Sequence, residues 1–164
     1  MESFEGKSLK EDIHIAIKRK PGCEDIPLPT YMTENAAGMD IYAAVESDTI
    51  VLPGERILIP TGIFIALPEG YEAQVRPRSG LAIHRGVTLL NAPGTIDADY
   101  RGEIGVIIIN HGQNPFVVKR KDRIAQIVVH KVYRVSWKES DNLETSARGH
   151  GGFGHTDQKI QNGQ

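Results

Sequence analysis

Residues 56–75, RILIPTGIFIALPEGYEAQV, contain three short apolar stretches separated by two turn signals. The stretches are residues 56–59, 63–67 and 71–75. They have the length and the β-branched or aromatic content that is typical of strands. The separators, PTG at 60–62 and PEG at 68–70, contain the proline and glycine that favour turns. This part of the chain therefore predicts a series of short strands joined by tight turns.

The same rhythm continues over most of the chain. Further strands are expected at residues 13–18, 39–45, 49–52, 87–90, 104–110, 116–118 and 124–133. Only residues 79–84 suit a short helix, with Ser79 in a position to cap it. About nine or ten strands at spacings of roughly 8–12 residues predict an all-β fold, a distorted jelly roll or β-sandwich.

One strand stands out by its apolar content. Residues 104–109, IGVIII, are too continuously apolar for a strand that has one face in water. Two environments are consistent with this run: a central position in the sandwich, or burial in a contact between subunits.

Composition limits the class of protein. The chain has 164 residues, with 19 basic and 21 acidic side chains and a net charge of −2, which argues against a dedicated nucleic-acid binder. We expect no membrane partner either, because no apolar stretch approaches the roughly 20 residues of a membrane helix. The charged residues 1–11 do not resemble a secretory signal, and the single cysteine, Cys23, cannot form an internal disulfide. A cytoplasmic location is expected.

The C-terminal part differs in composition from the rest. We expect an N-terminal extension at 1–12, a jelly-roll catalytic domain at 13–136 and a flexible arm at 137–164. Residues 148–154, RGHGGFG, match the G-x-G-x-x-G pattern, but only ten residues follow and no βαβ unit can form. The segment is either a frayed end or an arm that closes over a ligand, with Arg148 on a phosphate and Phe153 stacked on a planar ring.

Two internal segments are candidate binding sites. Residues 76–82, RPRSGLA, place Arg78, Ser79 and Gly80 at a helix start, which suits an anion, although a capped helix with solvated arginines has the same residues. Residues 91–103, NAPGTIDADYRGE, gather an amide, carboxylates and a phenol in one hairpin. This set suits base recognition and general-base chemistry, and it is also ordinary turn composition.

Single polar residues complete the set of candidates. Asp40 and Gln126 lie in strands that are otherwise built for burial, so each needs a partner, and a core hydrogen bond would satisfy that need. The six histidines do not pair with cysteine or carboxylates at metal-ligand spacing, so a protein-held zinc is not expected.

Five segments in this order resemble the motifs of the trimeric dUTP pyrophosphatase (dUTPase) family. They are residues 37–43 (AGMDIYA), 77–82 (PRSGLA), 94–103 (GTIDADYRGE), 123–126 (RIAQ) and 148–154 (RGHGGFG). The matches span most of the chain, and five ordered matches are more specific than any single one. The last motif usually continues with Ser-Thr, whereas this chain has His155 and Thr156.

The resemblance implies a fold and a reaction. It implies a dUTPase-like β-clip, assembled as a homotrimer with shared active sites. The reaction is hydrolysis of dUTP to dUMP and pyrophosphate by Mg²⁺-dependent attack of water on the α-phosphate. Such an enzyme keeps uracil out of DNA and supplies dUMP for thymidylate synthesis.

The resemblance also implies roles for individual residues. The catalytic residues are Asp97 as the base that activates water, together with Gln126 and Asp40. The substrate-binding residues are Arg78, Ser79, Gly80, Asn91, Gly94, Thr95, Ile96, Asp97, Tyr100, Gly105, Arg148, Phe153, Gly154, His155 and Thr156. Tyr100 would pack under the deoxyribose, Arg148 would reach the γ-phosphate and Phe153 would cover the uracil. No side chain is expected to bind Mg²⁺ directly: phosphates and water would hold it, with Asp40 and Gln126 in the outer shell.

Two other classes of protein compete with this interpretation. A dCTP deaminase shares the fold but must activate water at the base, and the 78–82 segment, the Ile96-Asp97 pair and the aromatic glycine arm favour the dUTPase. A non-enzymatic nucleotide-binding regulator on the same scaffold is the second alternative. Every residue that the chemistry requires is present, which favours an enzyme.

Overall fold

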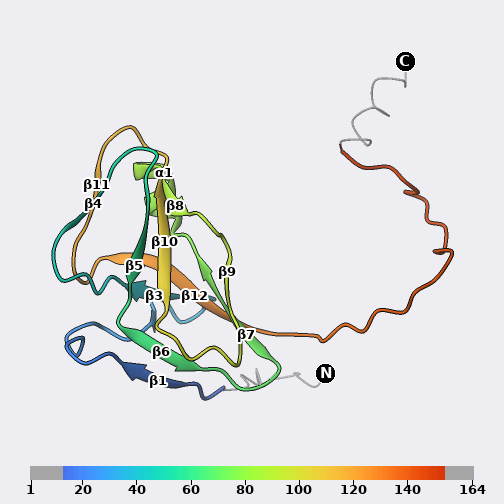
Figure 1. Ribbon diagram of the computed structural model, residues 1–164, viewed down its shortest axis with the longest axis horizontal. Helices are drawn as coiled ribbons and strands as arrows, with labels where there is room; N and C mark the ends of the chain where they lie inside the picture. Colours follow the sequence, from blue (N-terminus) through green and yellow to red (C-terminus); the bar gives the residue numbers. More distant parts are fainter. Residues whose placement is uncertain (1–12, 154–164) are drawn as a thin grey trace, which may run out of the picture. The chain divides into compact units, whose positions relative to one another are not determined.

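The computed structural model describes residues 13–153, and within them β-strands form almost all of the regular structure (Figure 1). The strands are β1 (Ala16–Arg19), β2 (Thr30–Tyr31), β3 (Met39–Tyr42), β4 (Thr49–Val51), β5 (Arg56–Pro60), β6 (Ile63–Ala66), β7 (Tyr71–Arg76), β8 (Val87–Leu89), β9 (Gly94–Ile96), β10 (Gly105–Asn110), β11 (Phe116–Val118) and β12 (Arg123–Lys131). One helix, α1 (Ser79–Arg85), follows β7. The predicted all-β fold with one short helix is confirmed.

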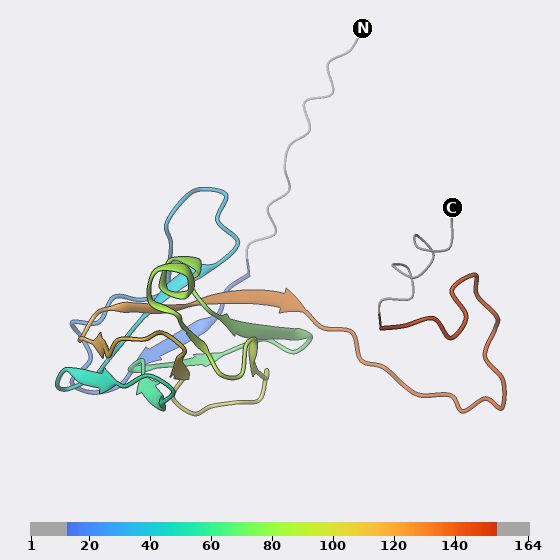
Figure 2. The ribbon, with the colours of Figure 1, turned by 90° about the horizontal axis from the view of Figure 1, so that it is seen from above.

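The strands form open antiparallel sheets that enclose one core. The largest sheet has the order β2-β3-β12-β7-β9, and the next has the order β5-β10-β8. Two pairs, β1-β6 and β11-β4, complete the layers. In Figure 2, β12 is the long orange strand on one side of the core, and shorter strands lie on the other side. This is the sandwich-like arrangement that the strand spacing predicts.

Burial of branched aliphatic side chains holds the sheets together. Ile41 of β3, Ile59 of β5 and Ile108 of β10 are fully buried in one cluster that draws on both large sheets. Each such side chain contributes roughly 1.5–3 kcal/mol when it leaves water. β10 lies between β5 and β8, so the apolar run at 104–109 has the central position, the first of its two predicted environments.

The structure adds two strands to the predicted set, β2 and β9. β9 pairs with β7 and becomes the edge of the five-stranded sheet, with Gly94 opposite Val75 and Ile96 opposite Ala73. It was not predicted because glycine and proline surround it and give the segment the composition of a turn. The hairpin that leaves β8 and returns in β10 therefore also contributes a strand to the other large sheet.

The start of α1 differs from the prediction. The expectation that Ser79 caps the helix is wrong: Arg78 is the N-cap residue, with extended backbone, and its carbonyl accepts the first helical hydrogen bond from Ala82 N–H at 3.1 Å. Ser79 is instead the first helical residue, so its hydroxyl is not in the cap position. Gly86 ends the helix with a φ of 67°, a left-handed conformation that glycine adopts without strain.

The chain divides into two compact units between Tyr133 and Arg134. The part of the second unit that the structure describes, residues 134–153, contains no helix or strand, and Trp137 and Leu143 in it are exposed. The predicted extension at 1–12 and the last residues of the predicted arm, 154–164, lie outside the described residues. No helix within residues 13–153 is long and apolar enough to cross a membrane.

Candidate active site

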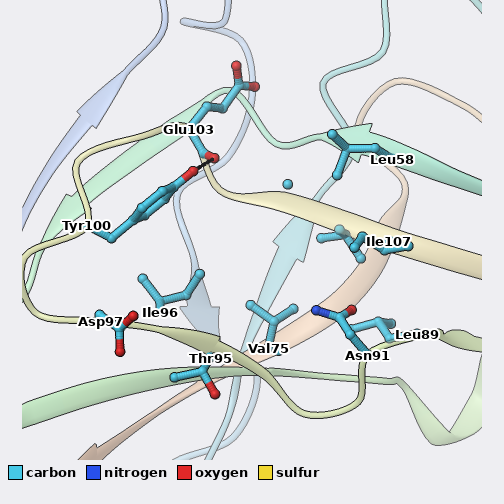
Figure 3. A pocket seen from close by; sticks show the side chains of 13 residues that line it. Leu58, Val75, Leu89, Asn91, Thr95, Ile96, Asp97, Tyr100, Glu103 and Ile107 are labelled. Atoms are coloured by element: carbon cyan, nitrogen blue, oxygen red, sulfur yellow. Dashed lines mark hydrogen bonds between the residues drawn. The ribbon is translucent and has the colours of Figure 1, made fainter.

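The hairpin between β8 and β10 forms a pocket of about 260 Å³ (Figure 3). Seven predicted site residues line it: Asn91, Gly94, Thr95, Ile96, Asp97, Tyr100 and Gly105. They come from a single segment because the chain folds back on itself from β8 through β9 to β10. The structure therefore brings together every hairpin residue that the resemblance selects.

The pocket has an apolar floor and a polar rim. Val75, Leu89 and Ile107 supply the apolar side, and Figure 3 shows the side chains of Asn91 and Asp97 at its edge. Pockets for whole drug-sized ligands measure roughly 300–1,000 Å³, so this smaller one suits a planar base and part of a sugar. The rest of a nucleotide needs other groups.

Two glycines let the backbone and its neighbours approach closely. A Cβ on Gly105 would lie 2.6 Å from Cδ1 of Leu58, and a Cβ on Gly94 would lie 3.1 Å from Nδ2 of Asn91. The first distance is an overlap, and the second is tighter than normal contact. Glycine at these positions keeps the pocket open and leaves main-chain atoms facing it.

Asp97 and Tyr100 occupy different environments in this pocket. Asp97 is exposed, and within residues 13–153 its carboxylate has no hydrogen bond or ion pair, so both oxygens are free to accept hydrogen bonds from water. The phenol of Tyr100 donates a hydrogen bond of 2.9 Å to the main-chain carbonyl of Glu103. The ring is thereby tied to the returning limb of the hairpin.

A second group of site residues gathers around Asp40. Its carboxylate is almost fully buried; Oδ2 accepts a hydrogen bond of 3.1 Å from Arg123, and Oδ1 lies 3.3 Å from Nε of Arg78. Arg78 also donates to the main-chain carbonyl of Arg123 at 3.0 Å. The predicted need of Asp40 for a partner is therefore met by two guanidinium groups. Ser79 and Gly80 follow at the exposed start of α1.

The group around Asp40 and the apolar floor of the pocket lie on opposite faces of the five-stranded sheet. Asp40 of β3 is directly opposite Gln126 of β12, which is opposite Arg76 of β7, so the three share one face. Val75, the neighbour of Arg76, points to the other face and lines the pocket. A single chain thus has the arginine group (Asp40, Arg78 and Arg123) on one face and the apolar floor of the pocket on the other, while Thr95 lies on the face of Arg76 at the edge of the sheet.

The structure offers no cluster of side chains for a metal ion in its described part. No group of three or more His, Cys, Asp or Glu residues between 13 and 153 could hold one. Asp40 is already paired with two arginines, which leaves it poorly suited to bind a cation directly. A divalent ion at this site would need ligands supplied by a substrate and water.

The predicted arm residues are only partly described. Arg148 donates from Nε to the carbonyl of Gly151 at 2.8 Å, and Phe153 is fully exposed. Gly154, His155 and Thr156 lie outside the described residues.

Comparisons with known proteins agree on one family. The dUTPase family model matches residues 24–157. The deoxyuridine 5'-triphosphate nucleotidohydrolase of Syntrophotalea carbinolica is 56% identical over 142 residues, which cover 87% of this chain and 97% of that protein. The chain belongs to the dUTPase family.

Solved dUTPase structures have the same fold. A dUTPase of Staphylococcus bacteriophage 80alpha, solved with dUpNHpp, superposes with a TM-score of 0.78 at 23% identity, covering 87% of this chain and 98% of that one. A dUTPase from phage phi11 of S. aureus, described with a structural Mg(II) ion, gives a TM-score of 0.71 at 21% identity, covering 79% and 98%. These likenesses support the fold of this dUTPase.

Several residues of the candidate site were not selected from the sequence: Leu58, Glu103 and Arg123, together with the apolar lining residues Val75, Leu89, Val106 and Ile107. Arg123 opens the 123–126 segment and could have been identified there, since it precedes Gln126 by three residues. Leu58 lies in β5, far along the chain from the hairpin, and nothing in its local sequence marks it. Glu103 ends the hairpin, and the segment around it has the composition of an ordinary turn, so the local sequence does not mark it.

Proposed function

We propose that the hairpin pocket is the base and sugar site at which this dUTPase hydrolyses dUTP to dUMP and pyrophosphate. The observation that carries this proposal is the gathering of all seven selected hairpin residues around one pocket, in a chain that belongs to the dUTPase family. The name of the Syntrophotalea relative, a deoxyuridine 5'-triphosphate nucleotidohydrolase, supports the same substrate and reaction.

Asp97 acts as the general base. Its unpaired, exposed carboxylate can accept a proton from a water molecule that attacks the α-phosphate, and positioned bases of this kind contribute typically 10²–10⁴-fold to rate. No covalent nucleophile is needed, because orienting the water and stabilising charge on the phosphate are sufficient.

The hairpin selects uracil and deoxyribose. The amide of Asn91 and the main chain of residues 94–96 offer donors and acceptors to the edge of the base. Gly105 leaves space for uracil on the opposite wall. The additional 5-methyl group of thymine would exceed this space. The ring of Tyr100 packs under the sugar where a 2'-hydroxyl would collide.

The arginine group binds the phosphates. Arg78, Ser79 and Gly80 supply a guanidinium, a hydroxyl and free main-chain N–H groups, and Asp40 holds Arg78 and Arg123 in place. Gln126 lies beside Asp40 on the same face and supports the water network. Mg²⁺, held by the phosphates and water with Asp40 and Gln126 in the outer shell, would neutralise charge on the triphosphate.

Active sites are shared within a homotrimer. The apolar floor of the pocket and the arginine group lie on opposite faces of the five-stranded sheet, which supports a site in which a second subunit supplies the phosphate-binding side chains to each pocket. The arm of a third subunit adds Arg148 at the γ-phosphate and Phe153 over the uracil, with Gly154, His155 and Thr156 beside the phosphates. The enzyme acts in the cytoplasm, where a single buried free cysteine, Cys23, is compatible with reducing conditions.

One assay separates the proposal from its rivals. Purified protein is incubated with Mg²⁺ and either dUTP or dCTP, and pyrophosphate and ammonia are measured in parallel. A dUTPase releases pyrophosphate from dUTP and no ammonia from dCTP. Ammonia release would indicate a dCTP deaminase, and nucleotide binding without either product would indicate a regulator.

A further inference from the structure

Glu103, the last residue of the hairpin, is bound through its side chain to two distant segments. Oε1 accepts a hydrogen bond of 2.9 Å from the N–H of Gly62, in the turn between β5 and β6. Oε2 lies 3.1 Å from Nζ of Lys20, just after β1. The carboxylate is 23% exposed, so it is partly removed from water in a site that satisfies both of its oxygens.

The main-chain carbonyl of the same residue holds Tyr100. The phenol oxygen donates to it at 2.9 Å, and Figure 3 shows the ring of Tyr100 reaching this carbonyl of Glu103. The side chain of Glu103 therefore fixes the main-chain carbonyl of the same residue, and this carbonyl in turn fixes the phenol of Tyr100.

Neighbouring hydrogen bonds strengthen this anchor. The hydroxyl of Thr61 donates to the carbonyl of Ile104 at 2.6 Å, and the N–H of Ile104 donates to the carbonyl of Ile63 at 2.9 Å. Gly62 is buried between them, and its N–H is satisfied by the Glu103 carboxylate. Loss of the carboxylate would remove this partner at the point where the hairpin joins β10.

The two contacts of the Glu103 carboxylate differ in how strongly they constrain its position. Lys20 is half exposed, and pairs of this kind contribute little because water and salt screen them. The hydrogen bond that Lys20 donates to Glu103 raises the pKa of Lys20 above its ordinary value. The buried N–H of Gly62 is the stronger constraint on the position of Glu103.

We propose that Glu103 is a positioning residue for substrate selection: by binding Gly62 it holds its own carbonyl, and through it the ring of Tyr100, at the angle that excludes ribose. This inference rests on the proposed function, which places Tyr100 under the sugar. Glu103 itself does not touch the reacting atoms. A released ring can move away from the sugar and admit a 2'-hydroxyl.

The test compares kcat/KM for dUTP with kcat/KM for UTP. In Glu103→Ala we expect the dUTP preference to fall about tenfold, because a displaced positioning group weakens discrimination more than turnover. The KM for dUTP should rise while kcat changes little. Glu103→Gln keeps an oxygen acceptor for Gly62 and should recover most of the preference. Glu55→Ala is the matched control, since Glu55 also binds a turn amide, Leu52 N–H at 3.0 Å, outside the pocket.

A double-mutant cycle identifies the route of the effect. Tyr100→Phe removes the hydroxyl that binds the Glu103 carbonyl, so it should itself lower the dUTP preference. In the Tyr100→Phe background, Glu103→Ala should lower the preference for dUTP less than it does in the wild-type protein. The effects of coupled residues are not additive. Tyr100→Phe is at the exposed rim, so it decides the question even if Glu103→Ala fails to fold.

Two results overturn the proposal: an unchanged dUTP preference in folded Glu103→Ala, or an unchanged preference in Tyr100→Phe. A failure of the proposed function looks different. In that case the wild-type protein itself would hydrolyse dUTP no better than UTP, before any substitution is made.

Discussion

Two aspartates of the candidate site have opposite surroundings, and this separates their roles. Asp97 is exposed and unpaired within residues 13–153, whereas Asp40 is buried between Arg78 and Arg123. The Asp40 carboxylate is engaged by a hydrogen bond from Arg123 and an ion pair with Arg78, whereas that of Asp97 is open to water. Asp97 therefore suits the general base, and Asp40 suits the task of fixing the arginines.

The role of Asp97 leads to a direct prediction. Asp97→Asn keeps the size of the side chain and removes the base, so kcat should fall about 10²–10⁴-fold. The affinity for dUMP should stay close to that of the wild type, because the pocket walls are unchanged. Steady-state kinetics and calorimetric binding of dUMP measure the two quantities. Turnover near the wild-type level would exclude Asp97 from the mechanism.

Gly105 gives a second prediction at this scale. A Cβ added in Gly105→Ala would overlap Leu58, whose exposed side chain can rotate into the pocket. The KM for dUTP should rise about tenfold, the scale expected for one methyl group in a pocket, with little change in melting temperature. The double variant with Leu58→Ala removes the overlap and should recover part of the loss. An unchanged KM in Gly105→Ala would show that this wall does not contact the base.

At the scale of elements, most strands could be predicted because their side chains alternate or form apolar runs. Residues 63–67 and 71–75 are examples, and β6 and β7 match them within one residue at each end. β9 could not be predicted, since its pairing with β7 outweighs a local sequence that favours turns. The cap of α1 was misassigned because Ser79 is a common cap residue, whereas the helix begins after the extended backbone of Arg78 and no side chain caps it.

The candidate site was predictable where its residues are contiguous. The seven hairpin residues lie within one segment and meet around one pocket. Leu58, Glu103 and Arg123 act through contacts with residues far away in the sequence, such as the bond between Glu103 and Gly62, 41 positions apart. Long-range pairs of this kind leave no periodic signal in a single sequence.

The loop after β1 and the turn before β12 are joined by a charge cluster that should depend on pH. Asp25 accepts from Arg120 at 2.6 and 3.0 Å and lies 3.1 Å from Lys121, and the hydrogen bond from Arg120 is the main reason that the pKa of Asp25 is lowered. A lowered folded-state pKa stabilises the fold above the unfolded-state pKa of about 4, and this contribution is lost as pH falls below it.

Asp25→Asn should therefore melt at a lower temperature than the wild type at pH 7, by a small amount because the pair is exposed. The difference should shrink as pH falls below about 4, because the Asp25 carboxylate then takes up a proton in the unfolded wild-type chain while it stays ionised in the folded protein. Asp48→Asn is the matched control, because Asp48 makes only a 3.7 Å contact with exposed Lys119. A difference that stays constant from pH 7 to pH 3 would contradict this account.

The C-terminal segment allows a prediction about an entire element. Truncation before Arg148 should leave the first unit folded, because its core is built from residues that precede 134. Activity should fall by at least tenfold through loss of the arginine and of the aromatic cover. Circular dichroism and dUTP turnover measure both properties. An unfolded product would show that the segment is structural, and an active one would show that it has no catalytic role.

At the scale of the whole molecule, the position of the two groups of site residues is decisive. Val75 and Ile96 line the pocket from one face of the five-stranded sheet, and Asp40 and Gln126 lie on the other face. The proposed function therefore completes the site with the arginine group of another copy of the chain, and this is the central claim of this account.

Mixed trimers test this claim most directly. Asp97→Asn and Arg78→Ala are each purified, unfolded and refolded together in equal amounts, and the formation of mixed trimers is checked by native mass spectrometry. If pocket and arginine group come from different subunits, about a quarter of the sites receive both intact parts by random assembly. The control pair is Asp97→Asn mixed with Asn91→Ala. Each of these variants has one change in the pocket, and the pocket is formed by a single chain.

The account predicts that the mixture of Asp97→Asn with Arg78→Ala recovers about a quarter of wild-type dUTP turnover, since each rebuilt site is complete. The control mixture should stay as inactive as its parents, because no combination of subunits restores a whole pocket. Mixed trimers of the first pair that remain inactive, or recovery of activity in the control pair, would contradict the shared site.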